Sequence, residues 1–484
     1  MPARRFHWNS LDSTNELIAG FEKIREELDV PEDFPTEVRK QSVRMAERGP
    51  QLPPGAGGMK VVDRRDIPFV AIDPPGSRDL DQAFAAEVRT DGGWRVFYAI
   101  SDVAAFVSPG SAIDDEARER GVTLYSPDLR SSLHPEALNE AAASLLADVD
   151  RQVLLWTIDL DATGAIDHAN VERATITNRR TMNYREAQDE IDNGTATPSL
   201  ALLKIIGEAR QELERQRGAV SLQLPAQEIT ERDGRFNLHF DEEVPVERWN
   251  AQISLLTGIA AAQIMIKGGV GLLRTLPTPD DFTIEEIRQT SLGLGIDWPE
   301  DMSYADRVRT LDPARPKEAA LLSRSARGLR GAGYVAFFNG DVPEYPEHSA
   351  IASVYAHVTA PLRRVADRFA NEIVLALCAE RDVPEWAIEA LPSLPAIMGR
   401  SKQNDRNLER AMTDYMEAIC MRGREGETFE SVVTAKGREW STLMIAEPAV
   451  IAGIKGTDFE LGAKLDVKLT DVNLERRRIT FEAA

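Results

Sequence analysis

The chain has 484 residues, of which 43% are hydrophobic, so it is long enough to build two or three domains with separate cores. Its 79 acidic and 57 basic residues give a net charge of −22, which by itself argues against a nucleic-acid binder, because phosphate contacts need cations. Net charge is a sum over the whole molecule, however, and a channel enzyme can keep its basic residues inside.

The sequence contains neither the apolar core of a signal peptide nor a run of about 18 apolar residues, so no membrane span is expected. Its two cysteines, Cys378 and Cys420, lie in helix-like apolar surroundings and predict a reducing compartment without a disulfide. We therefore expect a cytoplasmic protein.

The first 60 residues predict a helical arm followed by a linker. Residues 13–29 show helical spacing of apolar side chains, and Ser13 and Glu16 have the spacing of a capping box. Residues 49–58 are rich in proline and glycine, which is typical of a linker. We expect residues 1–60 to be too small to form a strong domain alone.

Residues 61–422 predict an α+β domain, with a mixed or antiparallel sheet packed against helices. Asp161 to Gly164 have the composition of a hairpin turn, and hairpins favour antiparallel pairing. The expected strands are 67–72, 82–88, 94–100, 152–159 and 165–175. The expected helices are 183–193, 198–216, 247–268, 317–331, 363–380 and 396–422.

Residues 423–484 change to short β-like runs separated by turns. The expected strands are 429–434, 442–446, 463–469 and 478–481. A small β-barrel of the OB type fits this length, and such barrels commonly bind single-stranded nucleic acid. A generic β domain is the alternative.

The most informative segment places Asp73, Asp79 and Asp81 within nine residues. A predicted strand precedes these acids and another follows them, so a sheet can direct all three carboxylates to one point. Hard oxygen ligands suit Mg²⁺ or Mn²⁺, and a divalent cation favours phosphate chemistry. The alternative is an acidic turn on the surface.

Four further segments follow the acid cluster in a recognisable order. They are Arg118–Asp128 with Leu133–Glu136, Trp249–Ala262, Tyr355–Asp367 and Asn407–Tyr415. Together with the acid cluster they resemble the ribonuclease II/R (RNB) superfamily of hydrolytic 3′-to-5′ exoribonucleases, over roughly residues 60–420. The tail resembles the OB-fold RNA-binding domain with which these enzymes usually end. The cold-shock domains with which they usually begin are not found in this sequence.

The resemblance implies that Asp73, Asp79 and Asp81 hold one or two Mg²⁺ ions, with Mn²⁺ as an alternative, and that Asp81 is tied most closely to catalysis. Arg363 would contact the scissile phosphate or stabilise the charge of the transition state, because its planar fork matches phosphate. A solvent-exposed arginine at a helix N-terminus is the competing interpretation of Arg363.

The resemblance also assigns RNA-binding residues. Tyr125 would stack on the terminal base, unless it is a core tyrosine, and Glu409 would clamp the last sugar or orient Arg363. A helix salt bridge with Arg406 or Arg410 is the alternative for Glu409. Three further candidates for RNA contact are Arg364, Gln252 and His357. For His357, as for His348, a structural role is favoured over catalysis.

The chain departs from the family pattern at three positions. Gln82 stands where the family usually has a fourth aspartate, Gln252 where it has a glutamate, and Val365 where it has an aromatic residue. Each glutamine keeps an oxygen but removes a negative charge, so we expect Gln82, if it is a metal ligand, to weaken metal affinity. Activity is then reduced, manganese-dependent or lost.

Three hypotheses follow for the function. The first is a metal-dependent exoribonuclease that threads single-stranded RNA into a basic channel and releases nucleoside 5′-monophosphates. The second is an RNA-binding protein that has kept the channel and lost efficient catalysis, and the third and least favoured is a structural partner protein. The basic clusters expected in the channel are Arg179/Arg180/Arg185, Arg324/Arg327/Arg330, Arg363/Arg364/Arg368, Arg400/Lys402/Arg406/Arg410 and Arg476/Arg477/Arg478.

Overall fold

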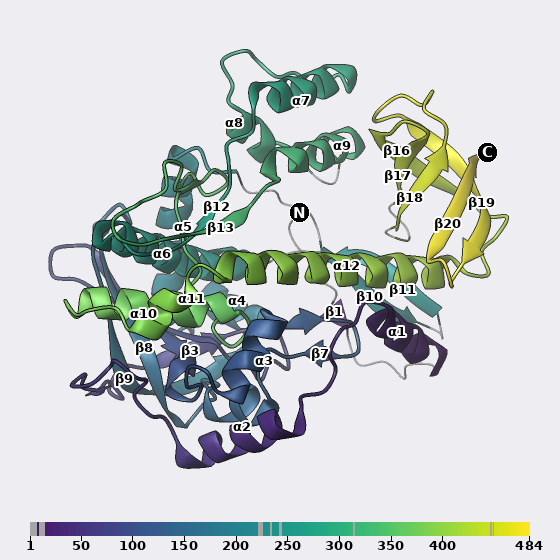
Figure 1. Cartoon of the computed structure of the whole chain (residues 1–484). Helices are drawn as coiled ribbons and strands as arrows, with labels where there is room; N and C mark the ends of the chain where they lie inside the picture. The colour runs from purple at the N-terminus through teal and green to yellow at the C-terminus, as the bar shows by residue number, and fades with distance from the viewer. Residues whose placement is uncertain are drawn as a thin grey trace.

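A computed structural model of the chain describes residues 7–8, 15–220, 226–232, 235–241, 244–312, 315–445, 448 and 450–484. Figure 1 shows a body of sheet and helices that carries most of the chain, and a separate C-terminal barrel at the upper right. One long helix runs across the molecule between them. The α+β class and the terminal barrel that the sequence predicts are confirmed.

The body is built on one six-stranded sheet with the order β2-β9-β3-β4-β5-β8. Its strands are β2 (Val62–Asp63), β3 (Phe69–Ile72), β4 (Gln82–Val88), β5 (Trp94–Ser101), β8 (Asp150–Leu160) and β9 (Ile166–Met182). The long strand β9 pairs antiparallel with β8 along its first part and parallel with β3 along its last part. The sheet therefore curls round so that β3 and β8 share one neighbour.

The turn between β8 and β9 follows from local side-chain chemistry. The Asp161 carboxylate accepts hydrogen bonds from the backbone N–H groups of Thr163 at 2.8 Å and Ala165 at 3.0 Å. Gly164 has a φ of +87°, which a residue without a β-carbon adopts at little cost. The predicted hairpin at 161–164 is confirmed.

Helices cover the sheet and form the largest core. They are α4 (Tyr184–Asp192), α5 (Pro198–Gln216), α6 (Pro245–Gly268), α10 (Val365–Cys378) and α11 (Glu385–Ala390). Helices α5 and α6 approach closely because position 207 is glycine. A β-carbon on Gly207 would lie 2.4 Å from that of Trp249, which is too close for any larger residue.

Two shorter helices, α2 (Thr36–Arg48) and α3 (Ala112–Arg120), pack at the lower end of the body in Figure 1. Short pairs of strands lie around it: β6 (Leu124–Tyr125) with β7 (Arg130–Ser131), and β14 (Glu347–His348) with β15 (Ser353–Val354). Strand β1 (His7–Trp8) pairs with β10 (Ala226–Arg232), which pairs in turn with β11 (Arg235–Asp241).

Strand β12 (Gly271–Thr275) pairs with β13 (Gly333–Phe337), and the chain between them forms a helical unit. This unit consists of α7 (Asp281–Gly293), α8 (Tyr304–Arg309) and α9 (Pro316–Ser325). It carries its own apolar cluster, and α9 packs beside the barrel strand β16 (Thr428–Lys436). Of these three helices the sequence predicted α9 alone.

The C-terminal barrel is closed, with the order β16-β17-β18-β20-β19. Its other strands are β17 (Trp440–Ile445), β18 (Val450–Lys455), β19 (Lys464–Asn473) and β20 (Arg478–Ala483). The sequence predicted four of these strands and missed β18. The missed strand contains Gly453 and is only partly buried, so it lacks the strong apolar alternation of its neighbours.

Helix α12 (Leu394–Met421) connects the body to the barrel, and α1 (Asn15–Glu27) packs against its C-terminal half. The Phe21 and Tyr415 rings meet edge to face with centroids 5.7 Å apart. The side chains of α1 share a core with α12 and the barrel strands, so the N-terminal arm and the C-terminal barrel are stabilised together. The expected capping box at Ser13 lies outside the described residues.

Within the described ranges, no helix is both long and apolar enough to cross a membrane. Cys378 and Cys420 are free thiols on α10 and α12.

A buried ion-pair network joins α10 to the sheet. Arg173 of β9 donates from Nε to the Asp102 carboxylate at 2.8 Å and from Nη2 to Glu372 of α10. All three side chains have exposed fractions of 2% or less. One guanidinium is thus the ion-pair partner of two buried carboxylates.

We predict that Arg173→Leu lowers the free energy of unfolding by about 3–5 kcal/mol, because it leaves both buried carboxylates uncompensated. Urea denaturation followed by circular dichroism measures the change. Arg64→Leu is the matched control, since Arg64 pairs with Glu172, the residue before Arg173, at 3.0 Å in a partly exposed position. The control should change stability by no more than about 1 kcal/mol. Equal losses in both variants would contradict the prediction.

Candidate active site

Asp81 joins two segments that are distant in the sequence. It directly precedes β4, and its side chain is 1% exposed. The backbone N–H of Leu362 donates to its Oδ1 at 2.8 Å, and Nε of Arg363 donates to its Oδ2 at 2.8 Å. Burial raises the pKa of Asp81 to about 7, against the opposing effect of the Arg363 charge. Asp81 and Arg363, which belong to separate sequence motifs, are thus in direct contact.

The segment that carries Arg363 is itself fixed by Asp367, in the first turn of α10. The Asp367 carboxylate accepts from the backbone N–H of Ala360 at 2.8 Å and binds the Arg364 guanidinium through two hydrogen bonds of 2.9 and 2.8 Å. Arg364 is therefore held toward its own helix. The Arg363 side chain, by contrast, is 40% exposed and accessible to a ligand.

Tyr125 lies beside this segment through backbone pairing. The N–H of Thr123 donates to the Arg363 carbonyl at 2.9 Å, and the N–H of Val365 donates to the Gly121 carbonyl at 2.9 Å. Tyr125 follows two residues later in β6 and is 50% exposed, so it is not a core tyrosine. Its electrostatic neighbours are Arg363, Asp79 and Asp81. A half-exposed ring here is available for stacking.

Asp79 is buried, and one of its oxygens accepts from Nη1 of Arg130, in β7. Nη2 of the same arginine donates to Glu140 at 2.9 Å. The other Asp79 oxygen, Oδ2, is buried and has no hydrogen-bond partner among the described residues. Asp73 lies after β3 and contributes to the electrostatic field at Arg363, as Asp81 does. The three aspartates are therefore electrostatic neighbours, Asp73 and Asp81 through Arg363, and Asp79 through Asp81.

A divalent cation suits the chemistry of these donors, because all are hard oxygens and the buried Asp79 Oδ2 offers an unused ligand atom. Asp73, Asp79 and Asp81 are the residues that would hold it. In the described part of the chain, however, no three acidic, histidine or cysteine side chains converge as a ready-made metal site. Arginines occupy Asp79 and Asp81 instead.

Gln82 is the first residue of β4, and its amide nitrogen donates to the Thr359 carbonyl. Thr359 also shares a hydroxyl hydrogen bond of 2.8 Å with Ser254 of α6. The amide of Gln82 thus holds the loop before Arg363. A role of Gln82 as a metal ligand stays a prediction.

Gln252 lies on α6 and is buried, and its amide nitrogen donates to Glu214 of α5. This contact joins two helices. A contact between Gln252 and RNA also stays a prediction.

His357 belongs to a cluster of aromatic and basic side chains beside Arg364. Its Nδ1 lies 2.6 Å from the Tyr334 hydroxyl, and its ring meets the ring of Tyr355 edge to face at 5.4 Å. Burial, together with the nearby arginines, holds the pKa of His357 well below its usual value, so it is neutral. Arg274 stacks on Tyr334 at 4.7 Å. These contacts support the structural role that the sequence favoured.

Glu409 lies partly buried on α12, where its carbonyl accepts from the Thr413 hydroxyl at 2.8 Å. Arg410, one of its two proposed salt-bridge partners, has Asp414 at 3.6 Å. The role of Glu409 at the last sugar stays a prediction.

Several of the basic residues expected in a channel have partners inside the protein. Arg324 pairs with Glu286 at 3.1 Å, and Arg400 donates to the Glu119 carbonyl at 3.2 Å. The side chain of Arg327 lies outside the described part of the chain. Lys402 donates to the Ala332 carbonyl at 2.8 Å, and burial, with Arg274 and Arg406 nearby, lowers its pKa to about 8.

The sequence did not identify Arg130 and Thr359, which contact the predicted site residues Asp79 and Gln82, or Glu140, which contacts Arg130. Arg130 follows Tyr125 by five residues, across a short hairpin. No motif marked it, because only the pairing of β6 with β7 brings it to Asp79.

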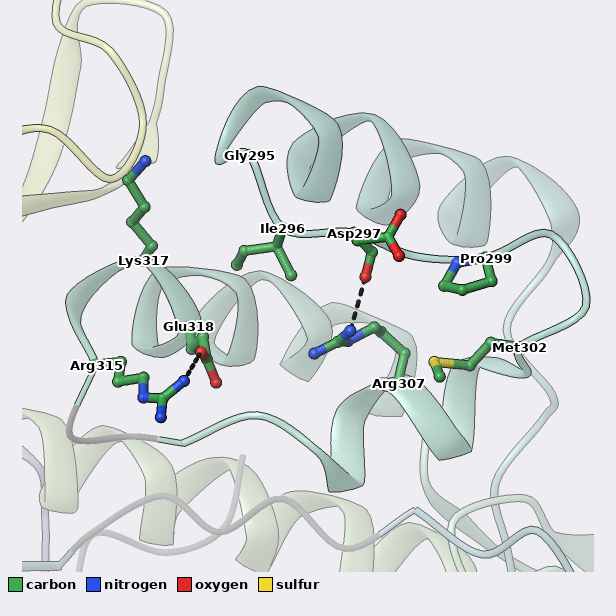
Figure 2. Close-up of a pocket in the computed structure, with 9 residues that line it drawn as sticks. All are labelled: Gly295, Ile296, Asp297, Pro299, Met302, Arg307, Arg315, Lys317 and Glu318. Atoms are coloured by element: carbon green, nitrogen blue, oxygen red, sulfur yellow. Dashed lines mark hydrogen bonds and ion pairs between the residues drawn. The ribbon is translucent and has the colours of Figure 1, made fainter.

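A separate pocket of about 540 Å³ lies in the helical unit α7–α9 (Figure 2). Two of its arginines have partners within the unit: Arg315 pairs with Glu318 at 3.1 Å, and Arg307 donates to the Asp297 carbonyl at 2.7 Å. None of its lining residues belongs to the acid cluster, so we do not place the active site there.

Comparison with known proteins agrees with this geometry. Residues 61–380 match the RNB domain, and residues 427–484 match the RNase II-type exonuclease C-terminal S1 domain. The chain belongs to the RNB family of exoribonucleases.

Ribonuclease R of Vibrio parahaemolyticus is 25% identical over 513 residues, which cover 94% of this chain and 59% of that protein. The chain spans between about two fifths and three fifths of the curated relatives it matches most strongly.

Two solved structures share the fold. Mycoplasma genitalium RNase R in complex with ribose-methylated single-stranded RNA has a TM-score of 0.85 and 19% identity, and the match covers 97% of this chain and 78% of that one. Yeast Ssd1, described as a pseudonuclease, has a TM-score of 0.71 and 16% identity, and the match covers 93% of this chain and 57% of that one.

His134 supports the active-site loop from below. It is fully buried and hydrogen-bonds to the backbone of Pro361, the residue before Leu362. Burial, with Arg368 nearby, lowers the pKa of His134 to about 3. The folded protein therefore keeps this histidine neutral in a range where the unfolded chain, with a pKa near 6.5, takes up a proton.

We predict that this difference in the pKa of His134 lowers the free energy of unfolding by about 2 kcal/mol when the pH falls from 7 to 5. The unfolded state takes up a proton as the pH falls through 6.5, and the folded state does not. His134→Gln should lose that part of the pH dependence. Urea denaturation at both pH values measures it, and His168→Gln, at an exposed position of β9, is the control. A His134→Gln variant with the pH dependence of the wild type would contradict the prediction.

Proposed function

We propose that this protein is a hydrolytic 3′-to-5′ exoribonuclease that acts on single-stranded RNA and releases nucleoside 5′-monophosphates. The observation that carries the proposal is the pairing of Asp81 with Arg363, next to a half-exposed Tyr125. An acid, a guanidinium suited to phosphate and an exposed aromatic ring that could stack on a base support this function in a chain of the RNB family.

Each side chain has a defined task in this proposal. Arg363 contacts the scissile phosphate and stabilises the charge that develops on it, since its guanidinium is partly exposed and fixed at Nε by Asp81. Tyr125 stacks on the terminal base, and stacking tolerates any base because every base has a π face. Water is the nucleophile, and no covalent enzyme intermediate is needed.

Asp73, Asp79 and Asp81, with Gln82 as a fourth candidate, would hold Mg²⁺ or Mn²⁺. A bound divalent cation would supply activation of the attacking water and stabilisation of the leaving oxygen. The acids lie beside Arg363, so the phosphate that Arg363 binds would be placed at the same point.

We propose that the RNA approaches the site along the cluster of Arg274, Tyr334, His357 and Lys402. Burial, and then the charge of Arg274, lower the pKa of Lys402 to about 8, as expected of positive charges held close together. A phosphate backbone would relieve this repulsion. The proposal includes Arg364, Glu409 and Gln252 as RNA contacts, and a cytoplasmic location.

The second candidate is an RNA-binding protein with weak or lost catalysis. The observation that favours it is the loss of negative charge at Gln82 and Gln252, whose amides hold a loop and a neighbouring helix. The fold is compatible with this alternative, because the yeast pseudonuclease shares it. The presence of Asp73, Asp79, Asp81 and Arg363 favours catalysis instead.

We expect the protein to shorten a 5′-labelled linear oligo(A) progressively from its 3′ end when Mg²⁺ or Mn²⁺ is present. Denaturing gels and detection of nucleoside 5′-monophosphate measure the reaction. EDTA should stop it, and a circular RNA of the same sequence should remain intact. Cleavage that persists in EDTA, or that opens the circle, would contradict the proposed function. RNA binding without cleavage would select the second candidate.

We predict that Asp81→Asn lowers the rate of oligo(A) hydrolysis by at least about 100-fold while RNA affinity changes little. Both Asp81 oxygens accept hydrogen bonds, and an asparagine offers only one acceptor, so Arg363 or Leu362 loses its partner. Single-turnover rates and fluorescence anisotropy measure the two quantities. Asp91→Asn, at the exposed β4–β5 turn, is the control and should behave as the wild type. Wild-type rates in Asp81→Asn would remove Asp81 from the mechanism.

A further inference from the structure

Arg130 links the acid cluster to a second carboxylate outside it. Its guanidinium forks, so that Nη1 donates to Asp79 and Nη2 donates to Glu140 at 2.9 Å. Glu140 lies in a π-helical turn, Ala137–Ala142, which is a rare conformation that occurs frequently at functional sites. The Arg130 guanidinium therefore pairs at the same time with Asp79, a predicted metal ligand, and with Glu140.

The two carboxylates are not equivalent partners for Arg130. Asp79 is buried, and Arg130 is its only ion-pair partner among the described residues. Glu140 has a second arginine, since Nε of Arg78 lies 3.5 Å from its other oxygen. Neighbouring backbone fixes Arg130 itself, because β7 pairs with β6 at Tyr125 and Arg130. A small rotation of its side chain suffices to favour one carboxylate over the other.

A divalent cation at Asp79 would compete with Arg130 for the charge of one carboxylate, even where the cation binds Oδ2 and Arg130 holds Oδ1. Both are attracted by the same carboxylate, and a positive guanidinium within contact distance of that carboxylate repels a cation that approaches it. The guanidinium keeps a charge-assisted hydrogen bond after such a displacement, because Glu140 already holds its other nitrogen.

We propose that Arg130 is a positioning residue that competes with the divalent cation for Asp79 and transfers to Glu140 when the cation binds. Arg130 thereby lowers the affinity of the site for the cation, and Glu140 counteracts this effect by giving Arg130 an alternative partner. The inference rests on the proposed function, in which Asp79 is a cation ligand. This role of Arg130 is consistent with the ion pairs of Asp79 and Asp81, each of which binds an arginine. Among the described residues, these acids do not form a three-ligand metal site.

The experiment is a titration of the RNA-free full chain with Mn²⁺, followed by electron paramagnetic resonance of the free ion. Arg130→Met should tighten the Mn²⁺ dissociation constant by at least about fivefold, because it removes the competing charge. Glu140→Gln should weaken it by a similar factor, since Arg130 then pairs with Asp79 alone. Arg130→Lys keeps the charge and should remain within about twofold of the wild type.

Arg78→Met is the matched control, because the Arg78 side chain is exposed and pairs with Glu140, whereas the ion pair of Asp79 is with Arg130. It should leave the dissociation constant within about twofold of the wild type. Thermal unfolding by circular dichroism identifies any variant that fails to fold, and Arg130→Lys then tests the charge independently of Arg130→Met.

The opposite directions expected for Arg130→Met and Glu140→Gln separate this role from a purely structural one, in which both variants shift Mn²⁺ affinity the same way or not at all. Either of those results would overturn the inference while the proposed function stands, provided that the wild type binds Mn²⁺. If neither the wild type nor Arg130→Met binds Mn²⁺, the inference and the metal dependence of the proposed function fail together.

Discussion

The candidate site depends on one buried carboxylate. Asp81 stands at the start of β4, and its two oxygens accept from the Leu362 backbone and the Arg363 side chain, which enter from a loop more than two hundred residues later. Since the carboxylate is almost fully buried, these contacts replace the water that it loses on folding. Asp81 therefore fixes the Leu362 backbone and the Nε end of Arg363.

Other parts of the structure reinforce the same loop. Asp367 binds the Ala360 backbone, Gln82 binds the Thr359 carbonyl, and His134 binds the Pro361 backbone. Consecutive residues of the loop thus have separate anchors on α10, β4 and the chain before the π-helical turn. Such support favours binding of a phosphate by Arg363, because less conformational entropy is lost when the loop is already ordered.

Several arginines of this acidic chain form ion pairs with buried carboxylates. Arg173, Arg130, Arg363 and Arg368 each pair with an aspartate or glutamate that is largely buried. These pairs fix strands and helices relative to one another, and they hold the acid cluster in an arginine-bound form. The charge balance of the whole chain therefore says little about the local field at Arg363 and Tyr125. A binding site for RNA is compatible with an acidic protein for this reason.

The sequence by itself determined the elements with strong periodicity and the residue types of the site. The hairpin at 161–164, every strand of the main sheet except β2, helix α12 and a terminal barrel were predicted, because their apolar spacing and turn residues are local properties. The motifs marked Asp81, Arg363 and Tyr125, and the structure brings these three together.

Only the tertiary structure decided which partners these residues have. Short helices such as α7 and α8 escaped prediction because few of their side chains enter a core, and β18 because its burial comes from barrel closure. The contacts of Arg130 with Asp79 and Glu140, and of Gln82 with Thr359, join residues from separate elements. Spacing along a chain records the period of a helix or strand, whereas ion pairing depends on distances that the packing of those elements creates.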